Sequence, residues 1–183
     1  ITTGGSMVWK DRRSTLTATL VRRMVEAGMI VLGKTHTVEF AMGSFGTNQH
    51  MGSPKNPWDL EDHRATGGSS AGTAAAVAAG LTPWGIGTDT GGSVRIPSAW
   101  CGLTGLKTSV GRISTHGILP LSHTLDTPGP MCRSVEDAAI LYRILAGPDE
   151  QDSRTVIHSV EDPFPELKKG ISGFKLARVP DSE

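Results

Sequence analysis

Two glycine-rich segments that carry serines lie close together in this chain of 183 residues. The first, GGSSAG, covers residues 67–72, and the second, GTDTGGS, covers residues 87–93. A nucleophilic serine needs a group that removes its proton and backbone N–H donors that hold the oxyanion, and glycine lets a backbone turn its N–H groups inward. The two loops therefore predict serine chemistry, and the fold must bring them together.

The stretch between the loops predicts a small-residue helix followed by a strand. Residues 72–80 consist of Gly, Ala, Thr and Val. Side chains this small allow neighbouring elements to approach closely, so we expect the helix to be buried. Residues 83–87, Pro-Trp-Gly-Ile-Gly, are expected to run as a strand into the second loop.

Two amphipathic helices are expected outside the loops. Apolar residues recur at helical spacing after Ser14, which can cap a helix that Gly28 ends. A second pattern covers residues 134–145, with Ser134 as the N-cap and acidic residues in the first turn, where they favour the positive end of the helix dipole. These helices would supply apolar faces for a core.

Extended and irregular segments are expected in the rest of the chain. The apolar run at 30–33 predicts a short buried strand, and residues 106–113 and 174–179 are expected to be extended. Residues 45–66 are rich in Gly, Asn, Pro and Asp, which predicts a long irregular connection. Long loops inside compact domains are often functional.

Composition limits the classes of partner. The chain carries 18 Lys and Arg against 18 Asp and Glu, which predicts no direct binding of nucleic acid or of a membrane surface. Its two cysteines, Cys101 and Cys132, are too few for a disulfide framework, so we expect both to be free in a reducing compartment. No stretch reaches transmembrane length. These features predict a soluble, cytoplasmic protein.

Other kinds of site are disfavoured by the context of the motifs. Residues 68–72 satisfy G-x-S-x-G, but that nucleophile elbow follows a strand, whereas a polar loop precedes Ser70. Residues 85–90 begin like a dinucleotide fingerprint but have Thr in place of the last Gly. The histidines and carboxylates show neither H-E-x-x-H nor clustered ligand spacing. We therefore expect no cofactor and no metal site.

Over nearly the whole chain, the sequence resembles the amidase signature family. The segments that carry the resemblance are residues 67–80, 87–102 and 105–107, with supporting matches at 33–36, 39–41, 56–58 and 125–130. The resemblance implies an α/β fold, the amidase signature fold, with a mixed β-sheet core flanked by helices on both faces. It also implies that residues 1–183 are a partial domain, a catalytic core truncated at both ends, without an N-terminal lysine-bearing segment and a C-terminal portion.

The resemblance further implies a triad of serine, cis-serine and lysine. Ser93 would be the nucleophile and Ser69, 24 positions earlier and preceded by a cis peptide, the bridging serine. A lysine can accept the proton through the bridging serine if burial or neighbouring positive charge lowers its pKa. The family places this lysine before the segment that residues 1–6 resemble, so we expect it outside this chain. Lys10, in a polar stretch, is the alternative, and Lys34 is expected to be structural.

The same resemblance assigns roles to the groups around the two serines. Ser70 would help to orient the serines, and Asp89 would brace the second loop through a charge-assisted contact with Arg95. The oxyanion hole would be formed by the backbone N–H groups of Thr90, Gly91, Gly92 and Ser93.

Three interpretations of function follow from the resemblance. The leading one is an amidase that hydrolyses a carboxamide C–N bond of a small-molecule substrate through a serine acyl-enzyme. The second is the A subunit of the tRNA-dependent glutamyl-tRNA(Gln) amidotransferase, which shares these motifs and releases ammonia from glutamine. The third is a noncatalytic fragment of such an enzyme, because the isolated chain is expected to be weakly active or inactive without its lysine. The first is compatible with a homo-oligomer, and the second requires partner subunits.

Overall fold

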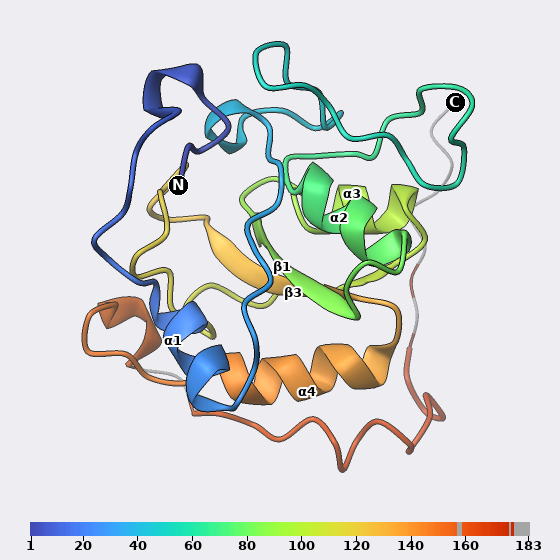
Figure 1. The fold of residues 1–183 in the computed structure, drawn as a ribbon. Helices are drawn as coiled ribbons and strands as arrows, with labels where there is room; N and C mark the ends of the chain where they lie inside the picture. The colour runs from blue at the N-terminus through green and yellow to red at the C-terminus, as the bar shows by residue number, and fades with distance from the viewer. Residues whose placement is uncertain (157–158, 176, 178–183) are drawn as a thin grey trace.

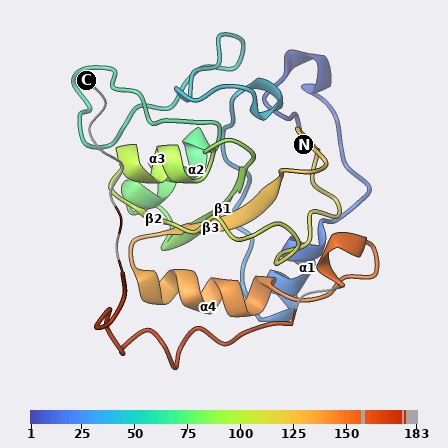
Figure 2. The same ribbon diagram turned by 180° about the vertical axis from the view of Figure 1, so that it is seen from behind.

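The computed structural model describes residues 1–156, 159–175 and 177, and it places a small sheet between two layers of helices (Figures 1 and 2). Helices α2 and α3 lie on one face of the sheet, and α4 lies on the other with α1 packed beside it. The α-helices are α1 (Thr19–Glu26), α2 (Ala71–Ala78), α3 (Arg95–Trp100) and α4 (Val135–Leu145). Short 3₁₀ helices are η1 (Met7–Trp9), η2 (Glu39–Ala41) and η3 (Ser153–Thr155).

The sheet has the strand order β1-β3-β2, and both pairings are antiparallel. Its strands are β1 (Trp84–Asp89), β2 (Thr104–Gly105) and β3 (Thr127–Cys132). The α/β fold with helices on both faces is confirmed, and the described strands form an open antiparallel sheet. Because Asp89 pairs with Thr127 at one end of the β1–β3 ladder, the second serine loop leaves the sheet directly beside the start of β3.

The central strand β3 contains two prolines and was not predicted. Pro128 and Pro130 pair with Thr88 and Ile86 of β1. In an antiparallel ladder the N–H and C=O of one residue point to the same neighbour, and the carbonyl of Pro130 accepts from Leu106, on the side away from β1. The missing proline N–H groups therefore face that same side, and the ladder to β1 keeps its donors. This arrangement lets a proline-containing segment serve as a fully buried strand.

Helix α4 forms the main core contact, and its predicted N-cap is confirmed. The Ser134 hydroxyl accepts from the backbone N–H of Asp137 at 3.1 Å. At the other end of α4, the guanidinium of Arg23 from α1 donates to the carbonyls of Leu145, Gly147 and Pro148 at 2.6 to 3.3 Å. A cation at this end complements the helix dipole and ties α1 to α4. The buried cluster between them contains Leu20, Met24, Ile113, Cys132, Ala138, Leu141 and Leu145.

The first predicted helix begins later than expected. It begins at Thr19 after an N-cap at Ala18 that makes no side-chain hydrogen bond, whereas the Ser14 hydroxyl bonds within a local turn to Leu16. Ser14 therefore stabilises a turn, because its short side chain competes for nearby backbone groups. Gly28, at a φ of +84°, follows the end of the helix as predicted.

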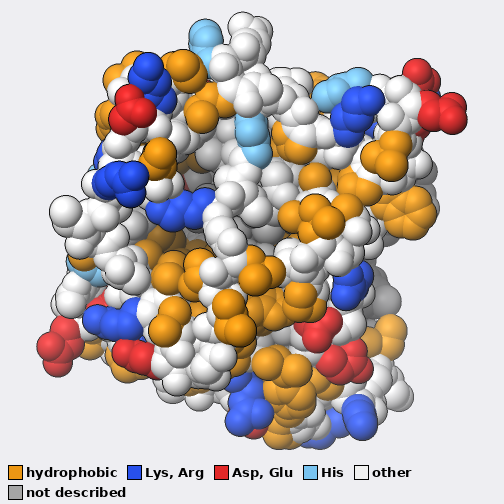
Figure 3. Space-filling model, viewed as in Figure 1, with side chains coloured by type: hydrophobic (Ala, Val, Ile, Leu, Met, Phe, Trp, Pro, Cys, Tyr) orange, Lys and Arg blue, Asp and Glu red, His pale blue; other side chains and the backbone are white. Residues whose placement is uncertain are grey.

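The buried strand expected at 30–33 is wrong. Ile30 is 82% exposed and Leu32 is 74% exposed, and no strand forms there. Hydrophobic side chains gather on the face of the molecule that this segment crosses (Figure 3). An apolar run becomes a buried strand only when a neighbouring strand pairs with it, and the described strands pair with one another instead. Farther along, the segment contacts helix α2, where the Thr35 hydroxyl lies 2.6 Å from the hydroxyl of Thr73.

The remaining expectations have mixed outcomes. The small-residue helix and the strand after it are confirmed, at 71–78 and 84–89. The extended segment expected over 106–113 is not a strand, because the chain turns at Gly111 and makes only an isolated bridge from Ile113 to Ala146. The strand expected over 174–179 lies partly outside the described residues.

In the described part of the chain, no helix combines the length and the apolar character that crossing a membrane requires.

Both cysteines are free, as expected, and the structure also places both in the interior. Burial raises the pKa of the Cys101 thiol to about 11. Burial and the nearby carboxylate of Asp137 raise the pKa of Cys132 to about 12. Because the thiolate is the reactive form, the two side chains act as small apolar core groups.

Truncating the α4 core contact should destabilise the fold. Leu145 is fully buried, so Leu145→Ala is expected to lower the free energy of unfolding by about 2 to 5 kcal/mol. Ile140 on the same helix is 45% exposed, and Ile140→Ala serves as the matched control with a loss of about 1 kcal/mol or less. Urea unfolding followed by circular dichroism checks both values, and equal losses would contradict the assignment of the core face.

Candidate functional site

The second serine loop, residues 87–93, and the two residues after it are organised around the carboxylate of Asp89 at the end of β1. This carboxylate is fully buried and accepts hydrogen bonds from the backbone N–H groups of Gly92, Val94 and Arg95 at 2.8, 3.1 and 3.3 Å. The Arg95 guanidinium adds two more, at 3.1 and 3.0 Å. One side chain therefore fixes the backbone on both sides of Ser93.

The ion pair between Asp89 and Arg95 sets the charge of the loop. Burial favours the neutral acid, but the hydrogen bonds from the Arg95 side chain and from the loop N–H groups outweigh it and hold the pKa of Asp89 below its usual value. Arg95 remains 54% exposed at its side chain, so water still solvates part of the cation. Asp89 is thus an ionised, fully bonded structural anion, and its carbonyl also accepts from the Thr127 hydroxyl at 3.0 Å.

The loop presents backbone donors beside Ser93. Among the described residues, the N–H groups of Thr90, Gly91 and Ser93 have no acceptor. The N–H of Gly92 is used by Asp89 instead, so the four donors expected from the sequence reduce to three that are free. Gly92 adopts a φ of +129°, a conformation that L side chains rarely adopt, so this turn of the loop favours glycine.

The first serine loop contains a cis peptide between Gly68 and Ser69. The carbonyl of Ser69 accepts from the Val38 N–H at 3.1 Å and from the Thr37 hydroxyl at 3.0 Å, which fastens the loop to the segment before η2. The Ser69 hydroxyl is buried and has no hydrogen-bond partner in the described part of the chain. A buried hydroxyl without a partner is unusual and marks a position where a further polar group is expected.

Ser70 joins the two loops. Its N–H donates to the carbonyl of Ser93 at 3.3 Å, and its hydroxyl lies 3.2 Å from the N–H and 3.4 Å from the carbonyl oxygen of Thr88. A Cβ at Gly87 would lie 2.6 Å from the Ser70 oxygen, so glycine is needed there for this approach. The structure thus brings the two serine loops together over β1, with Ser93 half-buried.

No lysine among the described residues makes a hydrogen bond with the buried Ser69 hydroxyl. Lys34 bonds the Thr2 hydroxyl, and Lys107 bonds the carbonyl of Thr108 at 2.7 Å. Lys10 is exposed in a turn. None of the described lysines donates to Ser69. Nor do the described residues contain a group of three or more His, Cys, Asp or Glu side chains placed to hold a metal ion.

A further polar contact of the loop was missed by the sequence analysis. The Thr90 hydroxyl donates a hydrogen bond to the carboxylate of Asp126, 36 positions later in the chain. Asp126 is buried and directly precedes β3. The register that pairs Asp89 with Thr127 brings the two residues together, and the proline-rich sequence of β3 gave no signal of that strand.

Comparison with known proteins assigns the chain to a protein family. The family model described as Amidase matches residues 1–183. The chain is 50% identical over 159 residues to the A subunit of the glutamyl-tRNA(Gln) amidotransferase of Coxiella burnetii, covering 87% of this chain and 32% of that protein. It is 47% identical over 175 residues to the corresponding protein of Nitrosococcus oceani, with 96% and 36% covered. The chain therefore spans about a third of the length of these curated relatives.

Solved structures agree with this assignment. The crystal structure of the A subunit of the glutamyl-tRNA(Gln) amidotransferase from Thermotoga maritima is similar, with a TM-score of 0.88 and 44% identity, over 93% of this chain and 37% of that chain. The native peptide amidase from Stenotrophomonas maltophilia has a TM-score of 0.76 and 42% identity, over 82% and 32%.

The Asp89 network predicts a pH dependence of stability. A carboxylate whose pKa is lower in the folded state stabilises the fold above its unfolded pKa, and this contribution is lost as the pH falls through the folded value. The Asp89 contribution should therefore decline as the pH drops below about 4, the region of the ordinary value of 3.8. Asp89→Asn should be less stable than the parent at pH 7 and should lose less stability between pH 5 and pH 2.

Urea unfolding at a series of pH values measures this difference. Asp62→Asn is the matched control, because the Asp62 side chain is 77% exposed and its removal should leave the pH profile close to that of the parent. Parallel profiles for Asp89→Asn and the parent would contradict the role given to Asp89.

Proposed function

Because the chain belongs to the Amidase family, we propose that the protein cleaves a carboxamide C–N bond through an acyl-enzyme on Ser93. The observation that carries this proposal is the arrangement of the second loop. Asp89 holds the backbone on both sides of Ser93, and the N–H groups of Thr90, Gly91 and Ser93 are left without acceptors among the described residues. Donors fixed in this way can stabilise a developing oxyanion without reorganising during the reaction.

The proposed reaction uses the two serines in turn. The Ser93 oxygen attacks the amide carbon, and its proton passes to the Ser69 oxygen as the Ser69 proton passes to a base. The negative charge on the carbonyl oxygen is held by the loop donors. When the tetrahedral intermediate collapses, the C–N bond breaks, and Ser69 donates its proton to the leaving amine as the protonated base returns a proton to Ser69. Water then hydrolyses the ester on Ser93 by the same route and releases the acid.

We propose that the base is a lysine of the intact protein that lies outside residues 1–183. The Ser69 hydroxyl has no partner in the described part of the chain, and the relatives are about three times as long as this chain. A neutral lysine at that position would occupy the open side of the Ser69 hydroxyl and accept its proton. The isolated 183-residue chain is accordingly expected to be weakly active or inactive.

A second candidate is the ammonia-releasing component of a glutamyl-tRNA(Gln) amidotransferase. The A subunits of the Coxiella burnetii and Thermotoga maritima enzymes are 50% and 44% identical to this chain, which favours this role. The peptide amidase at 42% identity supports the amidase role almost equally. Copurification of the intact protein with partner subunits would favour the transferase, whereas an active homo-oligomer would favour the amidase.

Replacing the proposed nucleophile tests the function. In the intact protein that contains residues 1–183, Ser93→Ala is expected to lower ammonia release from L-glutamine and small primary carboxamides by at least about 1,000-fold. Ser69→Ala should lower it by about 100-fold or more, because it removes the proton relay. Ser172→Ala changes an exposed serine far along the chain and should leave the rate unchanged. Full activity of Ser93→Ala would refute the proposal.

A further inference from the structure

We propose that Asp126 is a positioning residue that fixes the second serine loop, and with it the proposed oxyanion donors, through the hydroxyl of Thr90. The inference rests on the proposed function, since it concerns the geometry of the donors beside Ser93. It adds a contact from a distant part of the chain to the bracing that Asp89 supplies inside the loop. It also extends the structural support of the site to residues 149–155, which the motifs of the two loops do not include.

The contact between Thr90 and Asp126 lies at the first free donor of the loop. Asp126 is buried, and its carboxylate accepts hydrogen bonds from three groups: the Thr90 hydroxyl, the Leu121 N–H at 2.8 Å and the Ser122 N–H at 3.1 Å. An ionised carboxylate only accepts hydrogen bonds, so these donors match it. Because the Thr90 hydroxyl and the Thr90 N–H belong to one residue, fixing the side chain also limits rotation of the backbone that presents the donor.

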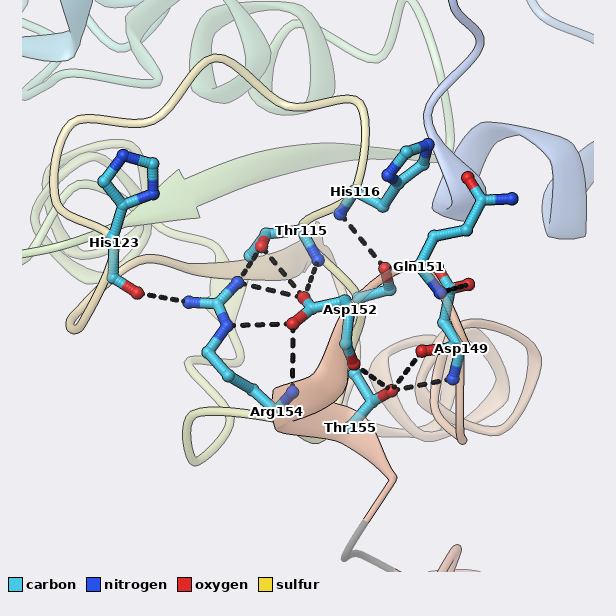
Figure 4. Close-up of polar contacts among 9 residues, drawn as sticks. Thr115, His116, His123, Asp149, Gln151, Asp152, Arg154 and Thr155 are labelled. Carbon is cyan, nitrogen blue, oxygen red and sulfur yellow. Dashed lines mark hydrogen bonds and ion pairs between the residues drawn. The ribbon is translucent and has the colours of Figure 1, made fainter.

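The loop that carries Asp126 is held from its other side by Arg154. The guanidinium donates to the carbonyl of His123 at 2.6 Å and forms a two-point ion pair with Asp152, with both distances 2.9 Å (Figure 4). Asp152 is buried and also accepts from the N–H and the hydroxyl of Thr115, both at 2.9 Å. A planar guanidinium held in this way is a rigid anchor, because its fork geometry fixes orientation as well as distance.

The segment that carries this ion pair is itself closed by hydrogen bonds. The Thr155 hydroxyl accepts from the Asp149 N–H at 2.7 Å, and the Ser114 hydroxyl donates to the Asp149 carboxylate at 2.6 Å. Figure 4 shows Asp149 and Asp152, which precede η3, together with Arg154 and Thr155 of η3 and Thr115 of the loop at 114–116. Residues 149–155 are therefore held in place by several hydrogen bonds. Arg154 connects them to the 121–126 loop, and Asp126 of that loop contacts Thr90.

The charged groups of this network are satisfied internally. A cavity of about 460 Å³ is lined in part by Asp126, Asp152 and Arg154. Their hydrogen bonds go to Thr90, Thr115 and the backbone of the 121–126 loop, and the two charges of the ion pair compensate each other. This use of the side chains favours a positioning role over recognition of a charged ligand in that cavity.

The predicted consequence is a loss of turnover with little loss of substrate binding. Oxyanion donors act mainly on the transition state, so a displaced donor lowers kcat more than it raises KM. Removing an oxyanion donor outright costs on the order of 100 to 1,000-fold in kcat, and a donor that is only loosened should cost less. We therefore expect Thr90→Val and Asp126→Asn each to reduce kcat by about 10 to 100-fold, with KM within about twofold.

The experiment compares these variants in the intact protein, with ammonia release from L-glutamine and small primary carboxamides as the readout. Thr90→Val removes the hydroxyl and keeps the backbone N–H and the β-branched shape, whereas Thr90→Ser keeps the hydroxyl and should recover kcat to within about threefold. Because Asp126 is proposed to act on the loop through the Thr90 hydroxyl, the double variant should match Asp126→Asn within about threefold. Asp62→Asn is the exposed control.

The outcomes separate this inference from the proposed function. Unchanged kcat in Thr90→Val, or losses that multiply in the double variant, would overturn the positioning role while an inactive Ser93→Ala leaves the nucleophile in place. If the parent releases no ammonia, the proposed function fails, and hydrogen exchange of residues 87–95 decides the inference. Faster exchange in Thr90→Val and Asp126→Asn, but not in Asp62→Asn, would support it, and unchanged exchange in both would overturn it. If Asp126→Asn does not fold, the Thr90 pair decides alone.

Discussion

The buried carboxylate of Asp89 is the interaction on which the candidate site depends. It lies at the end of β1, where the strand gives way to a loop that has no ladder to support it. Five hydrogen bonds from three residues replace that ladder, and an Arg95 guanidinium supplies the charge that keeps the carboxylate ionised in a buried place. Without this anion the loop would have to bury several unpaired N–H groups, which is costly. The conformation of the loop therefore follows from satisfying one charge.

Close packing then brings the first serine loop, which carries Ser69 and Ser70, to this second loop. Small side chains in α2 and glycine at position 87 let the chain around Ser70 approach β1, and Ser70 bonds the backbone of both Thr88 and Ser93. Ser69, which directly precedes Ser70, is directed into the interior by the same contacts and by the segment at 37–38. A buried hydroxyl next to a loop whose N–H donors have no acceptor among the described residues is the combination that a proton relay and an oxyanion site require.

Local patterns were sufficient to predict part of this arrangement. Helix α4 has an apolar period and a serine N-cap, the α2 segment has uniformly small side chains, strand β1 directly precedes a glycine-rich loop, and the loops themselves were evident from their glycines. Strand β3 could not be predicted, because Pro128 and Pro130 normally exclude a central strand, and their tolerance depends on which side lacks a neighbour. The exposure of Ile30 likewise depends on an absent pairing among the described strands. Whether the Gly92 N–H is free, and whether Thr90 meets Asp126, are set by tertiary contacts that no local pattern encodes.

The most direct test of the account is to locate the acyl group on the protein. Trypsin is expected to release residues 65–95 as one peptide that holds Ser69, Ser70 and Ser93, so fragmentation by tandem mass spectrometry must assign the modified serine. The intact protein that contains residues 1–183 would be mixed with a slowly hydrolysed carboxamide and quenched in acid. The account predicts an ester on Ser93, in a loop held by Asp89. An acyl group on Ser69, on Ser70 or outside this peptide would contradict it.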